Sequence, residues 1–170
     1  MHLFITGGVG SGKSTIIRRI LQKVRRPVYG FLTEKGPASP LGKEITMRPA
    51  AGGNGRVVAV CQSETTFLTD VAALEEFGTE LLSDIPDGAL VLMDELGFFE
   101  SSAPAFCEQV LKTLNRNVTV LGAIKPLPLP FLDSVRNHPR VRIVTVSPET
   151  RDAALAFAEE WFFGPEGFKG

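Results

Sequence analysis

The stretch that decides the fold is GGVGSGKST, residues 7 to 15. It fits the pattern G-x-x-x-x-G-K-[ST], with Gly7, Gly12, Lys13 and Ser14 at the fixed positions. Glycines let the backbone turn so that successive N–H groups face one anion, and the N-terminus of a following helix adds partial positive charge. The stretch therefore predicts a phosphate-binding loop between a strand and a helix.

Each residue type in this loop has a part in holding a triphosphate. The Lys13 ammonium reaches the β- and γ-phosphates, and the Ser14 hydroxyl binds Mg²⁺. A dinucleotide-binding G-x-G-x-x-G pattern can be drawn through Gly8 and Gly10, but it leaves Lys13 and Ser14 unexplained. The expected nucleotide-binding residues are Gly7, Gly8, Val9, Gly10, Ser11, Gly12, Lys13, Ser14 and Thr15.

The flanks of the loop have the periodicity that such a loop needs. HLFIT, residues 2 to 6, is a short β-rich run that ends at glycines, which is typical of a buried strand. After the loop, apolar residues recur at positions 16, 17, 20, 21 and 24, which is helical spacing, and Pro27 closes this helix. VYGFLT, residues 28 to 33, predicts a second strand.

Residues 34 to 62 interrupt the alternation of strands and helices. The first ten of them, EKGPASPLGK, have the composition of a loop. EITMRPA and RVVAVCQ then flank AGGNG, which has the residues of a tight turn. A β-hairpin is therefore expected between the second strand and the next helix.

Helices and strands alternate through the rest of the chain. The expected elements are a helix over 70–85 capped by Asp70, a strand at 89–93, a helix at about 102–115, a strand at 118–124, a short helix at 131–138, a strand at 141–146, and a closing helix over 147–163 with Ser147 as cap and Pro148 at its first position. Such alternation predicts a mainly parallel sheet covered on both faces. The expected fold class is α/β, a three-layer P-loop NTPase sandwich with an inserted β-hairpin, as one domain over residues 1–170.

The buried-looking strand ALVLM, residues 89 to 93, ends in two adjacent acids, Asp94 and Glu95. A magnesium ion held by a phosphate-loop hydroxyl needs a second anchor, which is commonly an Asp at the end of a neighbouring strand. A carboxylate next to that Asp can accept a proton from water aimed at the γ-phosphate. Ser14 and Asp94 are therefore expected as metal ligands, and Lys13 and Glu95 as catalytic residues. Without the phosphate loop, the two acids would be interpreted as a solvated strand end.

Three residues near the acids have two interpretations each. Glu100 either caps the following helix or helps to orient the water or the metal. Phe98 and Phe99 either pack against the core or shield the site from solvent.

Composition limits the classes of protein to consider. The chain has 170 residues, of which 44% are hydrophobic and 22% charged, with a net charge of −1, which suits one globular domain with a substantial core. The absence of a basic surplus argues against a general nucleic-acid binder. No apolar stretch approaches the ~18 residues of a membrane span. A cytoplasmic protein is expected, as a monomer, with Cys61 and Cys107 as buried thiols.

Several motifs together resemble one known family. FITGGVGSGKST, GFLTE (30–34) and MDELGFFE (93–100) are similar to the phosphate loop, a strand and the acidic segment of the small P-loop nucleoside-triphosphatase family that includes the human cancer-related nucleoside-triphosphatase and thermophile homologues. VLGAI and VRNHPRVRIVTVSPETRD resemble its last two strands and the entry to its closing helix. The resemblance runs over almost the whole chain.

The resemblance implies a P-loop fold with an added strand between the phosphate loop and the acidic strand. It also implies Mg²⁺-dependent hydrolysis of nucleoside triphosphates such as ATP and GTP to diphosphates, with broad base tolerance. The residues that carry over are Gly7, Gly12, Lys13, Ser14, Asp94, Glu95 and Glu100.

The chain departs from the family pattern at three places. Phe98 stands where a Lys is common, Ala123 stands where a Thr is common, and KGPASP replaces an Arg-bearing segment. A missing basic residue near the γ-phosphate would weaken charge stabilisation in the transition state. Lys125, just past the VLGAI strand, is a candidate substitute, with a surface lysine as the alternative.

Other residues of the C-terminal third leave alternatives open. Each of Arg136, Arg140, Arg142 and Arg151 is a candidate for a nucleotide contact, with an exposed loop charge as the alternative, and Arg136 and Arg151 lie in the segment that resembles the family. Trp161, Phe162 and Phe163 are expected to pack in the core, with a protein interface as the alternative. The tail from residue 164 is expected to be mobile.

Three functions remain open at this point. A nucleoside-triphosphatase is the leading one. A small-molecule or nucleotide kinase would need an acceptor pocket and usually a basic lid, but residues 34–44 hold only Lys35 and Lys43. A nucleotide-controlled switch is the non-enzymatic alternative, although the N-K-x-D guanine motif of regulatory GTPases is missing.

Overall fold

The computed structural model describes residues 1–63, 66–98 and 100–165. Its strands are β1 (His2–Thr6), β2 (Val28–Ser39), β3 (Gly42–Pro49), β4 (Arg56–Cys61), β5 (Phe67–Thr69), β6 (Leu90–Leu96), β7 (Thr119–Ile124) and β8 (Val141–Thr145). Its helices are α1 (Lys13–Lys23), α2 (Val71–Ala73), α3 (Thr79–Leu81), α4 (Pro104–Asn115), α5 (Pro130–Arg136) and α6 (Arg151–Phe163), with a π-helical turn at Leu74–Gly78 and a 3₁₀ turn at Glu100–Ser102.

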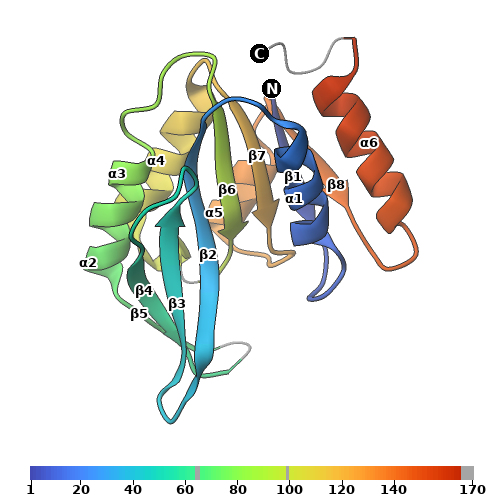
Figure 1. Cartoon of the computed structure of the whole chain (residues 1–170). Coiled ribbons are helices and arrows are strands. Elements are labelled where there is room, and N and C mark those ends of the chain that lie inside the picture. Colours follow the sequence, from blue (N-terminus) through green and yellow to red (C-terminus); the bar gives the residue numbers. More distant parts are fainter. Residues whose placement is uncertain (64–65, 99, 166–170) are drawn as a thin grey trace.

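The described strands form one sheet in the order β5-β4-β3-β2-β6-β7-β1-β8 (Figure 1). Strands β2, β6, β7, β1 and β8 run parallel, whereas β3, β4 and β5 extend the sheet beyond β2, each antiparallel to the strand before it. The predicted α/β class and the hairpin formed by β3 and β4 are confirmed. Strand β7 lies between β1 and β6, which is the added strand that the resemblance implied.

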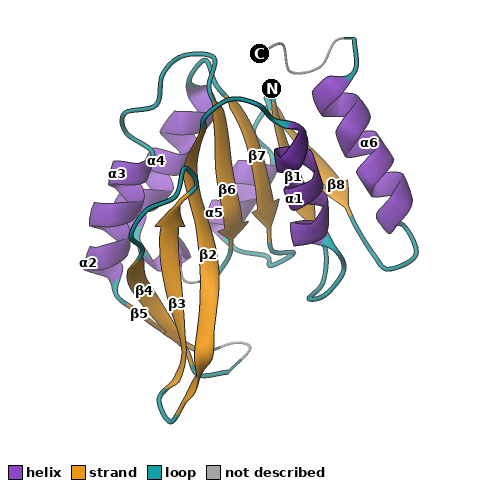
Figure 2. Cartoon of the chain, in the orientation of Figure 1, coloured by secondary structure: helices purple, strands orange, loops and turns teal. Residues whose placement is uncertain are grey.

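Alternating side chains of the central strands supply two separate cores. Leu3 and Ile5 of β1 pack with Ile16 of α1 and with the buried face of α6. Phe4, from the same strand, belongs to the other core, which includes residues of α4 and α5. Helices α1 and α6 therefore cover one face of the sheet, and the helices from α2 to α5 cover the other, so the molecule has three layers (Figure 2).

Strand β2 is longer than the sequence indicated. The loop expected from residue 34 is wrong, because Glu34 and Lys35 pair with Thr46 and Ile45 of β3. The register shifts between Lys35 and Ala38, where Pro37 lies, and a bulge is a place where a strand tolerates proline. The short edge strand β5 was not predicted at all.

The helix expected over 70–85 begins as predicted but ends early. Asp70 caps it, since the Asp70 Oδ1 accepts a hydrogen bond of 2.9 Å from the Ala73 N–H. The last helical residue is Leu81 rather than residue 85. Ser83 ends the regular ladder, because its N–H donates to the Glu80 carbonyl and its hydroxyl donates to the Thr79 carbonyl.

The start predicted for the closing helix is also wrong. The helix α6 begins at Arg151, and Thr150 rather than Ser147 is its N-cap residue. Ser147 and Thr150 instead close a turn of their own: the Ser147 N–H donates to the Thr150 hydroxyl at 3.0 Å. The turn holds Pro148 outside the helix.

The structure also tests the expected burial of the two cysteines and of the aromatic residues at the end of α6. Cys61 and Cys107 are free and half-buried rather than buried. Phe162 packs in the core, as expected, whereas the Phe163 side chain is 43% exposed. In the described part of the chain, no helix combines the length and apolar character needed to cross a membrane.

Candidate active site

The candidate site lies at the carboxyl edge of the parallel strands. The phosphate loop follows β1, Asp94 and Glu95 are near the end of β6, and Lys125 follows β7. Ile124 at the end of β7 is in register with both Thr6 of β1 and Leu96 of β6. The sheet order therefore brings the loop, the acids and the lysine together, as ligand sites of open α/β sheets generally require.

Lys13 connects the loop to the acidic strand. Its ammonium donates hydrogen bonds to the carbonyl oxygens of Gly7 at 2.8 Å and Gly8 at 3.1 Å. The Lys13 Nζ also lies 3.4 Å from the Glu95 Oε1. The two residues predicted as catalytic are thus in contact, although 82 positions separate them in the chain.

Two glycines of the loop are required by close approach. A Cβ at Gly7 would collide with the carbonyl oxygen of Val146, and one at Gly12 would meet the Arg151 Nε. Gly12 also has φ of +115°, which side-chain-bearing residues rarely adopt. These positions let the loop pack against the segment that enters α6.

Two cavities meet at Ser14. The first, which we call the loop cavity, has a volume of about 280 Å³ and is lined by Gly10, Ser11, Gly12, Lys13, Ser14, Thr15 and Arg151. The second, which we call the acid cavity, has a volume of about 230 Å³ and is lined by Ser14, Thr33, Lys35, Ile45, Asp94, Glu95, Gly97, Glu100 and Lys125. Of the remaining predicted loop residues, Gly7 and Gly8 meet Lys13 through their carbonyls, whereas the Val9 side chain is 97% exposed.

Asp94 is held at the boundary of the core. The Thr33 hydroxyl donates a hydrogen bond of 3.1 Å to the main-chain oxygen of Asp94. Burial, and next the neighbouring Glu95 charge, raise the pKa of the Asp94 carboxyl to about 6, against the opposing effect of Lys13. A cation bound beside the Asp94 carboxylate would lower its pKa again, because positive charge opposes the effects of both burial and the Glu95 charge.

The donor set of the acid cavity fits a hard divalent cation. Ser14 and Asp94 offer only oxygen ligands to the same cavity, which suits Mg²⁺. Among residues 1–63, 66–98 and 100–165, no group of three His, Cys, Asp or Glu side chains is arranged to hold a metal. Mg²⁺ is typically held by one or two protein ligands together with substrate phosphates, so the two ligands Ser14 and Asp94 suit this ion.

Glu100 is completely buried beside the acids. The Gly97 N–H donates to the Glu100 Oε2 at 2.8 Å, which ties the chain after β6 to the start of the 3₁₀ turn. Glu100 also lines the acid cavity. Its Oε1 has no hydrogen-bond partner in the part of the chain that the structure describes. Burial raises the pKa of the Glu100 carboxyl to about 8. Glu100 does not cap α4, whose N-cap residue Ala103 has no side-chain cap hydrogen bond, and its part in orienting the water or the metal stays a prediction.

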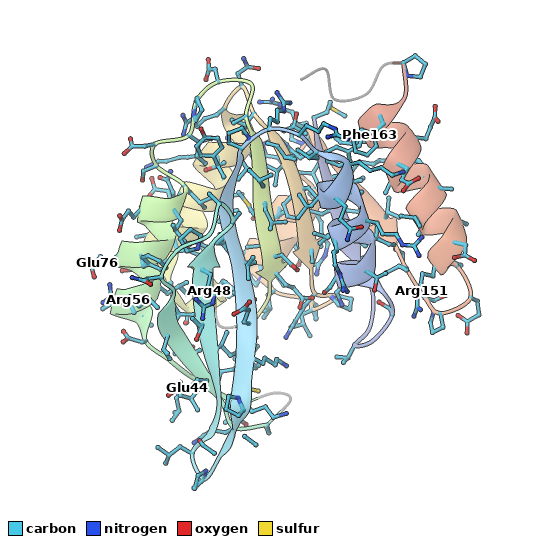
Figure 3. All side chains as sticks on the ribbon, in the orientation of Figure 1. Glu44, Arg48, Arg56, Glu76, Arg151 and Phe163 are labelled. Atoms are coloured by element: carbon cyan, nitrogen blue, oxygen red, sulfur yellow. The ribbon has the colours of Figure 1, made fainter. Side chains whose placement is uncertain are left out.

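One of the four candidate arginines reaches the loop. The Arg151 guanidinium donates to the carbonyl oxygens of Ser11 at 3.1 Å and Gly10 at 3.3 Å, from the first turn of α6 (Figure 3). Arg136 instead donates to the Lys125 and Leu127 carbonyls and fixes the segment after β7. Arg140 bonds the Arg116 carbonyl, and Arg142 lies over the Phe157 ring.

Strands β2 and β3 contribute cavity residues to which the sequence analysis assigned no part in the nucleoside-triphosphatase site. These are Thr33, Lys35 and Ile45. The motif GFLTE includes Thr33, and its resemblance to a family motif was a signal that this strand belongs to the site. Phe98 is 44% exposed and stacks on Phe67 with 5.7 Å between ring centroids. Phe99 lies outside the described residues.

Comparison with known proteins agrees with this architecture. The model of a family described as "NTPase" matches residues 2–157. The human cancer-related nucleoside-triphosphatase is 28% identical over 182 residues, covering 91% of this chain and 92% of that protein. The nucleoside-triphosphatase THEP1 of Thermotoga maritima is 28% identical over 160 residues, covering 91% of each chain.

Solved structures show the same fold. The crystal structure of THEP1 from Aquifex aeolicus superposes with a TM-score of 0.72 at 22% identity, covering 92% of this chain and 96% of that one. The solution structure of a human cancer-related nucleoside triphosphatase gives a TM-score of 0.70 at 23% identity, with 92% and 94% coverage. Since the family model matches most of the chain, and the phosphate loop and acids are placed at one edge of this sheet, the protein belongs to the NTPase family.

Proposed function

We propose that this protein hydrolyses nucleoside 5′-triphosphates to diphosphate and phosphate, with Mg²⁺ and with broad base specificity. The observation that carries the proposal is the contact between Lys13 of the phosphate loop and Glu95 at the end of β6. In this contact the Lys13 ammonium, which would bind the phosphates, lies beside a carboxylate that would receive a proton from water. The names of the relatives, which are nucleoside-triphosphatases, support the same reaction.

The parts of the site would act as follows. Backbone N–H groups of the loop and the Lys13 ammonium would bind the β- and γ-phosphates. Ser14 and Asp94 would hold Mg²⁺, which offsets the charge that develops on the phosphate oxygens. Glu95 would orient the attacking water and accept its proton. Water attacks the γ-phosphorus, the bond to the β–γ bridging oxygen breaks, and the diphosphate leaves.

The lining of the cavities supports broad base specificity. The described walls of the loop cavity are mainly small residues of the loop, with Lys13 and Arg151 as the long side chains. The hydrogen-bonding side chains around the loop cavity, Ser11, Lys13, Ser14, Thr15 and Arg151, gather at the phosphate loop. Recognition would therefore centre on the triphosphate.

The test is phosphate release from ATP, GTP, CTP and UTP, with and without Mg²⁺, for the wild type and Glu95→Gln. We expect turnover of several nucleotides in the wild type, and a rate lower by roughly 10²–10⁴ in the variant with nucleotide binding retained, as for a lost general base. Glu108→Gln, which removes an exposed acid of α4, is the control and keeps wild-type turnover.

Two results would contradict the proposal. Wild-type turnover by Glu95→Gln would show that Glu95 does not have the proposed part. Tight nucleotide binding without phosphate release by the wild type would favour a kinase that lacks its acceptor or a nucleotide-controlled switch. Phosphoryl transfer to added small hydroxyl compounds would then separate these two functions.

A further inference from the structure

Lys125 lies between the phosphate loop and the acidic end of β6. It directly follows Ile124 of β7, which is in register with Thr6 before the phosphate loop and with Leu96 after the acids. The Lys125 N–H donates to the Leu96 carbonyl oxygen at 2.9 Å. The main chain therefore fixes this residue between the end of β1 and the end of β6.

The side chain of Lys125 is held in a defined position. Its ammonium lies 5.6 Å from the centroid of the Phe67 ring, a cation–π contact with the edge strand β5. Its methylene groups pack against Gly97, where an added Cβ would approach the Lys125 Cδ to 3.0 Å. The residue is half-buried and lines the acid cavity. Such a lysine has lost much of the rotamer freedom of a surface lysine.

The Lys125 ammonium is not part of any ion pair among the residues that the structure describes. The acid cavity has three carboxyl groups, those of Asp94, Glu95 and Glu100, but none of the described carboxylates forms an ion pair with the Lys125 ammonium. Lys13, by contrast, is bound by two carbonyls and by Glu95. Lys125 does interact electrostatically with Glu100, where its charge lowers the pKa of the carboxyl against the effect of burial. The acid cavity thus has a positioned cation that none of the described carboxylates holds in an ion pair.

The cavities indicate which anion this cation would meet. The loop cavity and the acid cavity share Ser14, so a phosphate chain bound in the first would continue past Ser14 into the second. Its terminal phosphoryl group would then lie in the cavity that Lys125 lines. We propose that Lys125 is a catalytic residue that contacts the γ-phosphoryl oxygens and stabilises the negative charge of the transition state, with Phe67 as the positioning residue that orients its ammonium.

This inference rests on the proposed hydrolysis of nucleoside triphosphates. Removing a positioned cation should lower the rate of the chemical step more than the affinity for the substrate. The reason is that the cation interacts more strongly with the phosphoryl oxygens in the transition state than in the bound substrate. Lys125→Met removes the charge and keeps the apolar stem. We expect kcat to fall by about 10²–10³, as for a lost oxyanion donor, while ADP binding is unchanged.

Two comparisons separate a catalytic role from a structural one. Lys125→Arg keeps the positive charge and is expected to restore part of the lost kcat. Lys112→Met removes an exposed lysine of α4 and is expected to keep wild-type kcat. Wild-type kcat in Lys125→Met, with the variant folded by its melting temperature, would overturn the proposal.

A double-mutant cycle tests the part of Phe67. Phe67→Leu keeps an apolar side chain but removes the ring under the ammonium, and we expect a smaller fall in kcat than for Lys125→Met. In the Lys125→Met background, Phe67→Leu is expected to cause no further fall in kcat, because Phe67 affects the reaction only by orienting the Lys125 ammonium. Additive losses in the double variant would overturn the positioning role of Phe67.

A binding measurement keeps the inference separate from the proposed function. Fluoroaluminate with Mg²⁺ and ADP mimics the transferred phosphoryl group, and its complex does not depend on turnover. We expect Lys125→Met to weaken the fluoroaluminate complex far more than binding of ADP alone. Equal weakening of the two would refute the role of Lys125, whereas a wild type that forms the complex but releases no phosphate from any nucleotide would refute only the proposed hydrolysis.

Discussion

The ammonium of Lys13 lies 3.4 Å from the Glu95 Oε1, so an ion pair joins the phosphate loop to the end of β6. The same ammonium donates hydrogen bonds to the Gly7 and Gly8 carbonyls. One side chain therefore fixes the shape of the loop and the distance between the loop and the acid. A triphosphate would enter a site in which these groups already have their relative positions.

Lys13→Met should lower nucleotide affinity and kcat together. The change removes the cation for the β- and γ-phosphates, releases the two loop carbonyls and leaves the Glu95 carboxylate without its partner. A fall in kcat of about 10²–10³ is expected for the lost transition-state charge. Titration of ADP and ATP, with phosphate release, checks both parts. Lys23→Met, at an exposed ion pair between α1 and α6, is the control; unchanged ATP affinity in Lys13→Met would contradict the argument.

The sequence predicts the loop and the acids well because their signals are local. The glycines, Lys13 and Ser14 occupy one continuous stretch, and Asp94 and Glu95 follow a run of apolar residues. The other wall of the acid cavity depends on contacts between distant segments. Thr33 reaches the site only because β2 pairs with β6, which brings its hydroxyl to the Asp94 carbonyl, and no local pattern reveals that pairing.

The errors in the fold have a similar origin. Gly36 and Pro37 are strong local signals for a loop, but the ladder with β3 continues beyond them through a bulge. Ser147 and Pro148 have the composition of a helix start, but hydrogen bonds between Ser147 and Thr150 stabilise a separate turn. Composition expresses only a preference for a local structure. Strand pairing overrode that preference in β2, and side-chain hydrogen bonds overrode it at the start of α6.

Asp94→Asn should raise the Mg²⁺ concentration needed for half-maximal phosphate release. The amide keeps the size of the side chain, but it replaces a charged oxygen ligand by a neutral one at the cavity that Asp94 shares with Ser14. A Mg²⁺ titration at saturating ATP is the measurement, and Asp133→Asn on α5 is a matched control at an exposed acid. The same half-maximal concentration in the wild type and Asp94→Asn would exclude Asp94 as a ligand.

His2 should make the protein less stable as the pH falls below neutrality. Its Nδ1 accepts a hydrogen bond from the Val120 N–H, and its Nε2 bonds the Leu114 carbonyl, which requires the neutral ring. Burial lowers the pKa of His2 from 6.5 to about 4. The unfolded state therefore binds a proton near pH 6.5 and the folded state only near pH 4, so stability is lost between these values, by at most about 3 kcal/mol.

Denaturant unfolding of the wild type and His2→Gln between pH 4 and pH 7 checks this slope. The free energy of unfolding of the wild type should fall more steeply toward acid than that of the variant, even if the variant is less stable at pH 7. His138→Gln changes the half-buried second histidine, for which a smaller effect is expected. Parallel curves for the wild type and His2→Gln would show that His2 is not the titrating group.

Glu100→Gln should have the opposite pH dependence. Burial raises the pKa of Glu100 from 4.5 to about 8, so the unfolded carboxyl ionises above pH 4.5 and the folded one only above about pH 8. The stability that comes from keeping this proton is complete below pH 4.5 and is lost as the pH rises through 8. Glutamine keeps the acceptor for the Gly97 N–H and does not ionise.

The variant Glu100→Gln should therefore gain stability relative to the wild type as the solution becomes alkaline. Urea unfolding at pH 5, 7 and 9 measures the difference, which should grow between the first and last values to the order of a few kcal/mol at most. The two windows overlap but have opposite slopes, so the variants His2→Gln and Glu100→Gln separate them. A difference that stays constant from pH 5 to pH 9 would show that the pKa of Glu100 is not raised in the folded protein.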